Sequence, residues 1–288
     1  GGSSSANVGV NVTNSGAILG GGAATVTVTG TGGAGDSDAV YVGGPISSVA
    51  GKILIDGVKD SGGLGADVVV DATVTTTGGG DIEIRSGRNV TGGAGGDITS
   101  AGTSDGNVAI TAADDTHGGP NVVGTIQLDG DITAGVGTVT LGLPDCDGYL
   151  GSGLNLATGQ GTGANGSIVS ASQVIKNDTG ALRLNGTANA YTGTTTVNAG
   201  ILIVNGVITT DGGALTVKGG AVLGGNGTIG ATAGGRDIVV EAGGILDVGD
   251  VDPNSCAIAY PGQLTLNGDL TFDPNGILRV QLNSMVAG

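Results

Sequence analysis

The chain has 288 residues, of which 64 are glycine, and it carries a formal net charge of −16 because it holds only nine Lys plus Arg. So few basic residues exclude the basic patches by which proteins hold nucleic acid or anionic membranes. Hydrophobic residues reach 38% and charged residues only 12%, which argues against the disorder that a glycine-rich composition can signify. We therefore expect a folded chain with a thin aliphatic core, since the sequence has no Trp and one Phe.

Short segments in which apolar and polar residues alternate recur along the chain. In one of the first, Ile82 and Ile84 alternate with Glu83 and Arg85. A period of two with one apolar face predicts a β-strand, here of about four or five residues. Asn-Gly and Asp-Gly pairs, which tolerate left-handed backbone, close many of the segments. The predicted strands lie within residues 79–87, 124–130, 137–142, 180–186, 213–220, 244–250, 262–268 and 276–282.

Two all-β architectures have short strands at this spacing, an antiparallel sandwich and a parallel β-solenoid. We favour the solenoid because stacked coils suit small aliphatic core residues and glycine corners, whereas a sandwich of this size usually buries Trp, Tyr and Phe. One coil cannot bury its apolar face alone, so it needs a neighbour on each side to pair its backbone groups. At roughly 20 residues per coil, the chain would form about 14 coils.

We divide the chain into three segments. Residues 1–50 are predicted to form a β-rich segment that serves as a cap or an assembly contact, residues 51–173 an irregular β-solenoid, and residues 174–288 a more regular one. No apolar run reaches the roughly 18–20 residues of a membrane span. The chain starts with Gly and shows no signal peptide, so we expect a processed protein or a segment of a longer one.

A specific repeat pattern lies in the third segment. It consists of a Leu-x-Leu strand, a glycine, Asn-x-Tyr-x-Gly, Thr-x-Val and then Gly-x-Leu-x-Val-x-Gly, with one extra residue before the Asn. The residues that carry it are Leu182, Leu184, Gly186, Asn189, Tyr191, Gly193, Thr195, Val197, Gly200, Leu202, Val204 and Gly206. The pattern resembles the passenger-associated transport repeat of bacterial autotransporters, over about residues 174–282. Residues 50–143 resemble filamentous haemagglutinin-like adhesins more loosely.

The resemblance implies a right-handed parallel β-helix of short strands with Gly-, Asn- and Asp-rich turns. It also implies a protein that is exported to the surface of a Gram-negative-type bacterium or released outside it. Residues 249–260 depart from the pattern and look like an insertion.

Three acidic loops are candidate calcium sites, because calcium prefers oxygen ligands supplied by loops. Residues 92–100 match the start of a calcium-binding nonapeptide. Residues 250–254 have the alternating ligand spacing of a calcium loop, but Ser255 stands where a glycine is expected and Pro261 where a glutamate is. Each loop alone is also an ordinary acidic turn, and together they make structural Ca²⁺ the predicted cofactor. The candidate ligands are Asp97, Asp145, Asp147, Asp250, Asp252 and Asn254.

The two cysteines, Cys146 and Cys256, are predicted to lie about five coils apart, on the order of 25 Å. A disulfide requires Cα atoms within about 7 Å of each other. The two cysteines are therefore either free or paired between neighbouring molecules of an assembly.

Ile201 and Ile203 alternate with Leu202 and Val204, which the pattern places in the core. The two isoleucines would then face outward and form an apolar strip. Such a strip is either a lateral contact with another molecule or a surface covered by a loop.

The only candidate for acid–base chemistry is the group Asp114, Asp115 and His117, which a solvated polar loop explains equally well. Basic residues are otherwise scattered, whereas enzymes that cleave acidic polysaccharides on β-helices need them clustered with Asp. We therefore predict that the chain is not an enzyme.

The leading functional hypothesis is an extracellular structural protein, a β-solenoid rod that serves as a stalk or fibre subunit and associates end to end with copies of itself. The alternative is an adhesin that binds surface proteins or glycans through its irregular regions, residues 30–50, 111–123, 142–173 and 249–261. An enzyme acting on polysaccharides is the third hypothesis.

Overall fold

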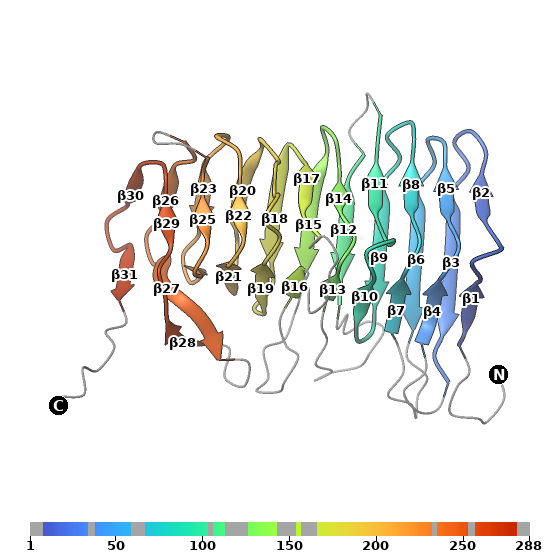
Figure 1. Cartoon of the computed structure of the whole chain (residues 1–288), viewed down its shortest axis with the longest axis horizontal. Coiled ribbons are helices and arrows are strands. Elements are labelled where there is room, and N and C mark those ends of the chain that lie inside the picture. Colours follow the sequence, from blue (N-terminus) through green and yellow to red (C-terminus); the bar gives the residue numbers. More distant parts are fainter. Residues whose placement is uncertain are drawn as a thin grey trace.

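The computed structural model is an all-β rod in which short strands stack from one end of the chain to the other (Figure 1). It describes residues 8–33, 38–58, 67–102, 106–112, 126–142, 154–156, 166–231, 235–252 and 257–280. Strands, bridges and turns make up these residues, and no helix occurs among them. Within these ranges there is accordingly no helix that could cross a membrane.

The chain winds as a right-handed parallel β-helix with three faces, which confirms the predicted fold. Each coil places one strand on face 1, one on face 2 and one on face 3, and strands on the same face pair in parallel with those of the next coil. The third face is an unbroken 10-stranded sheet, so the described residues form ten coils, followed by the first strand of another. The pairing continues across both predicted segment boundaries, at residues 50 and 173.

Each face of the rod is a ladder of short strands. Face 1 holds β1 (Val10–Val12), β4 (Asp38–Val42), β7 (Asp67–Val70), β10 (Val90–Gly92), β13 (Ile126–Leu128), β16 (Leu154–Leu156), β19 (Ala181–Leu184), β21 (Ile201–Val204), β24 (Val222–Gly224), β27 (Ile245–Asp252) and β31 (Ile277–Val280), with β28 (Ala257–Pro261) beside β27. Face 2 holds β2 (Ile18–Gly20), β5 (Ile46–Ser48), β8 (Val74–Thr76), β11 (Ile98–Ser100), β14 (Ile132–Thr133) and β17 (Ile168–Ser170), then β22 (Val207–Ile208), β25 (Thr228–Ile229) and β29 (Thr265–Leu266). Face 3 holds β3 (Val26–Thr31), β6 (Ile53–Val58), β9 (Ile82–Ser86), β12 (Val108–Thr111), β15 (Thr138–Gly142), β18 (Gln173–Asn177), β20 (Thr194–Val197), β23 (Leu215–Val217), β26 (Ile238–Val240) and β30 (Leu270–Phe272).

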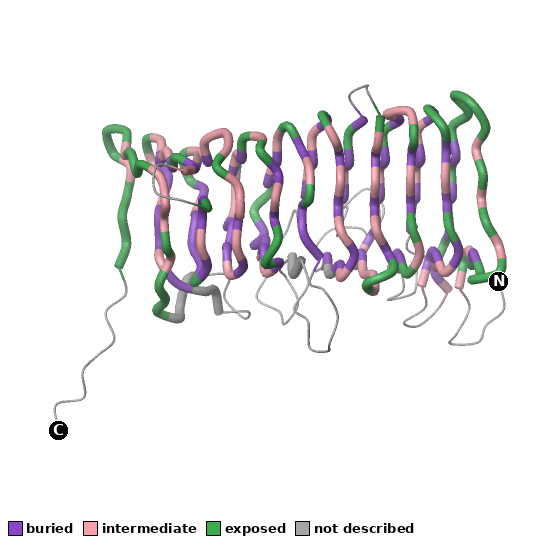
Figure 2. Tube along the Cα trace, turned by 45° about the horizontal axis from the view of Figure 1, so that its top comes forward, coloured by how far each residue is buried: buried purple, intermediate pink, exposed green. Residues whose placement is uncertain are grey.

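The core is a stack of aliphatic columns that runs the length of the rod (Figure 2). Alternation along each short strand turns every second side chain inward, and parallel pairing places it on its counterpart in the next coil. On face 3, for example, Ile55 pairs in register with Ile84, which pairs with Ile110, and all three are fully buried. The inward assignment of Ile82 and Ile84 made from the sequence is therefore confirmed.

The estimate of about 14 coils is wrong because coil length is not uniform. In the repeat-like part, Leu182 pairs with Leu202, and Leu202 pairs with Leu223, so a coil takes 20 or 21 residues there. Earlier in the chain Val90 pairs with Ile126, which makes that coil 36 residues long. The difference lies in the connections between strands, because the strands themselves keep the same length.

Glycine forms columns at the corners, which explains much of its abundance. A Cβ atom placed on Gly206 would lie 2.0 Å from the carbonyl oxygen of Gly186, and one on Gly227 would lie 2.1 Å from that of Gly206. Corners of adjacent coils therefore stack too closely for any side chain. One predicted corner is wrong: Asp56 and Gly57 lie inside β6, which continues through them in pairing with β3.

The insertion at residues 249–260 forms a hairpin at the side of the rod. The second half of β27 leaves the parallel stack and pairs antiparallel with β28 (Figure 1). The first half of β27 remains in the stack and pairs with β31.

Candidate functional site

The seventh coil, residues 181–200, differs from its neighbours because it has no strand on face 2. The face-2 sheet stops at β17 and a new one starts at β22, and a single bridge from Asn189 to Ile208 marks the place between them. Neighbouring coils place aliphatic residues such as Ile168 and Ile208 here, whereas this coil places the buried Asn189. We call the buried polar contacts around this coil the corner clamps.

The Asn189 side chain supplies the hydrogen bonds that a strand would otherwise make. Its Oδ1 accepts a hydrogen bond from the backbone N–H of Ile168, at 3.0 Å, in the coil before. Its Nδ2 donates to the carbonyl oxygen of Gly186, at 2.7 Å, and to that of Val207, at 3.2 Å, in the coil after. One amide therefore joins three successive coils at the corner between faces 1 and 2.

Arg236 forms the second clamp, at the corner between faces 2 and 3. Its Nη1 donates to the carbonyl oxygens of Gly193 and Gly213, both at 2.7 Å, and its Nη2 donates to that of Tyr191, at 2.8 Å. These carbonyl groups belong to the seventh and eighth coils, whereas Arg236 itself lies in the ninth. The guanidinium carbon lies 4.8 Å from the centre of the Tyr191 ring, in a cation–π contact.

Tyr191 turns into the core and fills the space beside this clamp. The ring is fully buried, and its hydroxyl lies 2.7 Å from Thr195 Oγ1. Thr195 stands in a core-facing column of face 3, between Val174 and Leu215. Burial raises the pKa of the Tyr191 hydroxyl, and the Arg236 charge and the Thr195 contact oppose that rise. Burial also lowers the pKa of Arg236.

Lys176 forms the third clamp, at the corner between faces 3 and 1. It is 1% exposed and stands in a core-facing column, paired with Leu141 on one side and Val197 on the other. Its ammonium donates to three carbonyl oxygens, those of Asn177, of Asp178 at 2.7 Å and of Ala199 at 3.4 Å. Burial lowers the pKa of Lys176 to about 8, although the nearby Asp178 charge opposes the shift.

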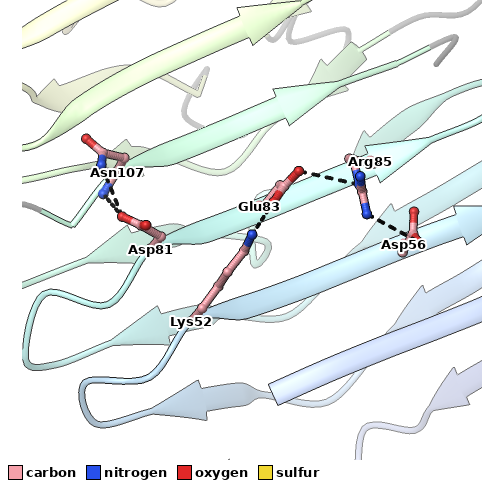
Figure 3. Close-up of polar contacts among 6 residues, drawn as sticks. All are labelled: Lys52, Asp56, Asp81, Glu83, Arg85 and Asn107. Atoms are coloured by element: carbon pink, nitrogen blue, oxygen red, sulfur yellow. Dashed lines mark hydrogen bonds and ion pairs between the residues drawn. The ribbon is translucent and has the colours of Figure 1, made fainter. Parts of the chain in front are cut away.

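The outer surface carries charged contacts of a more ordinary kind. On face 3, Lys52 pairs with Glu83, and Arg85 bridges Glu83 and Asp56 at 3.4 Å each (Figure 3). At the corner before these strands, Asp81 accepts hydrogen bonds from the backbone and side chain of Asn107. Such part-exposed ion pairs contribute little to stability.

Asp97, predicted to bind calcium, belongs to a ladder of side chains that hold the next coil. Its Oδ1 accepts the backbone N–H of Asp131 at 2.9 Å, and Asp131 in turn accepts the backbone N–H of Ser167. The structure therefore gives Asp97 a structural partner. Across the described residues, no group of three or more His, Cys, Asp or Glu side chains is placed to hold a metal ion.

The remaining calcium candidates are not brought together. The backbone of Asp250 and Asp252 lies in the extended strand β27, opposite Tyr260 and Ala257, whereas a calcium loop requires a turning backbone. Asn254, Asp145 and Asp147 lie outside the described residues, and so do both cysteines, Cys146 and Cys256. The possible acid–base group Asp114, Asp115 and His117 lies outside them as well.

The prediction of an exposed lateral strip at Ile201 and Ile203 is corrected by their burial. They are 7% and 0% exposed and form, with Ala181 and partly buried Val222, a small cluster separate from the main core. The two isoleucines do lie on the outward side of face 1, because Leu202 and Val204 fill the core. The strip is covered, as the alternative interpretation held, and it is not a free contact surface.

The fold is thus a parallel β-helix whose best-defined polar site is a set of structural clamps around one coil. Comparison with protein families finds that residues 174–204 match the passenger-associated-transport-repeat. This match confirms the resemblance drawn from the sequence, and it includes Asn189, Tyr191 and Lys176. The comparison with curated proteins found no significant match, and the comparison with solved structures found none either.

Sequence reasoning missed the buried cations, although a signal for both is present. Lys176 follows the inward-facing Val174 by two residues, and Arg236 precedes the inward-facing Ile238 by two. The same alternation that placed the aliphatic residues in the core would have placed these two side chains there.

Proposed function

We propose that this chain is a structural rod from the passenger part of an exported, autotransporter-type protein, acting as a stalk or fibre subunit at the surface of a Gram-negative-type bacterium. The observation that carries the proposal is the unbroken stack of ten coils, which is locked at the matched repeat by clamps that serve only neighbouring coils. Such an arrangement supplies length and rigidity. The match to the passenger-associated repeat supports export.

End-to-end association of the rods is part of the proposal. The apolar residues of the last coil are open to solvent: Leu278 is 53% exposed and Val280 63% (Figure 2). At the first coil, the corresponding inward residues Val26 and Val28 are only 6% and 4% exposed. A strand edge with exposed apolar side chains favours pairing with another chain. The C-terminal edge is therefore the proposed contact.

Negative-stain electron microscopy combined with light scattering tests this proposal. The whole chain is expected to form particles longer than a single rod, and Leu278→Glu is expected to return them to single rods. Leu19→Glu is the matched control, because Leu19 is 75% exposed on the outward side of the first coil. Single rods at every concentration, with and without calcium, would contradict association and leave the stalk as the remaining form of the proposal.

A second candidate function, adhesion, is favoured by the distribution of long connections. Connections from face 3 to face 1 take 14 residues between β12 and β13 and 11 between β15 and β16, but only three between β18 and β19 and between β20 and β21. The long connections therefore all leave the same corner of the rod, in its first half. In stacked-repeat proteins, insertions gathered on one side are often the binding surface.

Adhesion is tested by replacing residues 112–125 and 143–153 with the short connection Asp178–Gly180. Loss of binding to host cells or a glycan panel, with unchanged thermal unfolding, would support an adhesin. Unchanged binding would place any ligand elsewhere, and the hairpin of β27 and β28 would be the next segment to replace.

A further inference from the structure

Two stacked corners of the β-helix direct carbonyl oxygens at one point. In the sixth coil the chain turns through Asp178, whose φ of 61° is left-handed, and in the seventh it turns through Gly200, with a φ of 66°. Carbonyl oxygens of both corners, from Asn177, Asp178 and Ala199, surround the Lys176 ammonium. The corner thus has the form of a small site built from main-chain oxygen.

The chemistry of the site matches a monovalent, hydrogen-bonding cation. An ammonium group has three N–H donors, and here it meets three carbonyl acceptors. In the part of the chain that the structure describes, no carboxylate forms an ion pair with Lys176. The Asp178 carboxylate itself points toward Gly142, because a Cβ on that glycine would lie 2.7 Å from Asp178 Oδ2. The charge is held by carbonyl dipoles.

The next corner repeats the arrangement with a different cation. The Arg236 guanidinium is fully buried and bonds to the carbonyl oxygens of Tyr191, Gly193 and Gly213. Across the described residues it too forms no ion pair with a carboxylate. Two of the nine basic residues of a chain with net charge −16 are therefore spent on main-chain oxygen in its interior.

We infer that the carbonyl oxygens of Asn177, Asp178 and Ala199 form a monovalent-cation site that the chain fills with its own Lys176, and that removing this side chain opens the site to ammonium ion from solution. The tethered ammonium does at this corner what a bound ion does in other proteins. It is present in every molecule and cannot be removed by a chelator. This inference is independent of whether the rods associate.

The test compares Lys176→Ala, which empties the site, with Lys176→Met, which fills the same space without a donor. The urea midpoint of each is measured in ammonium chloride and, at equal ionic strength, in tetramethylammonium chloride, whose cation is too large to enter and cannot donate. Lys176→Ala is expected to have a folding constant at least about tenfold below wild type, because buried acceptors lose their donors. It should recover part of that loss in ammonium only.

Wild type and Lys176→Met should not distinguish the two salts. Equal midpoints for Lys176→Ala in both salts would overturn the inference, as would rescue by Ca²⁺ in place of ammonium. If Lys176→Ala does not fold in buffer, recovery of its β-sheet circular dichroism in ammonium chloride, but not in tetramethylammonium chloride, would support the site. Failure to fold in both salts would contradict it.

Discussion

Replacing Arg236 by Met tests whether the corner clamps stabilise the rod. Met keeps much of the side-chain volume but removes the donors to Tyr191, Gly193 and Gly213, at 2.7 to 2.8 Å. Each buried carbonyl left without a donor costs about 1–3 kcal/mol. The variant also removes a desolvated charge, which offsets part of that cost. We expect a net loss of about 3–5 kcal/mol, in the range measured when one partner of a buried charged contact is removed.

The measurement is urea unfolding combined with hydrogen exchange, because a stacked-repeat protein can open locally without unfolding throughout. Protection should fall first in residues 189–217, which Arg236 holds together. Arg279→Met is the matched control: Arg279 is half exposed, its contact with Asp247 spans 3.7 Å, and its loss should cost under about 1 kcal/mol. Equal effects of the two substitutions, or loss of protection outside the seventh to ninth coils, would refute the clamp.

Three further predictions concern the other clamps and the corners. Asn189→Asp, which replaces the two Nδ2 donations by acceptors facing carbonyl oxygens, should lower the free energy of unfolding by about 2–4 kcal/mol in urea titrations, whereas an effect below about 0.5 kcal/mol would mean that Asn189 merely fills space. Because the pKa of Lys176 is about 8 when folded and near 10.5 when unfolded, the unfolded chain binds more protons between these values; the stability of wild type relative to Lys176→Met should therefore rise from pH 8 to pH 9.5, and a flat difference would place the amine in water. Gly206→Ala should destabilise the rod strongly because its Cβ would overlap the Gly186 carbonyl, whereas Gly21→Ala, with nothing within 4 Å, should be nearly neutral in a thermal melt.

The architecture could be predicted because its signal is local and repeated. Alternation of apolar residues specifies which side chains face inward, and Gly with few aromatics specifies tight coils with a thin core. The number of coils could not be predicted, because it depends on which residues pair across coils. The strand spacing of residues 180–206 suggested a length that the coil from Val90 to Ile126 does not keep.

The corner clamps were only half visible in the sequence. The repeat pattern names Asn189 and Tyr191, but it does not say that the amide of Asn189 replaces a strand, since that requires knowing that Ile168 and Val207 lie on either side. Arg236 is 45 residues from Tyr191 in the chain, so their contact depends on the stacking of three coils. Asp97 misled for the same reason: its motif suggested calcium, whereas its partner is the backbone of the next coil.

The two halves of the rod divide its structural and variable parts. From β18 onward the connections between faces 3 and 1 take three or four residues, and all three clamps lie there. Before β18 the connections at the same corner vary from three to 14 residues, while the core columns of faces 1 to 3 continue unchanged. Because loop length affects stability only weakly, about 0.6 kcal/mol per doubling, a well-clamped stack can carry variable connections at one corner. A rigid C-terminal half that supports a variable N-terminal edge would serve a stalk and an adhesin alike, so replacing those connections, while leaving the clamps intact, is the experiment that separates the two functions.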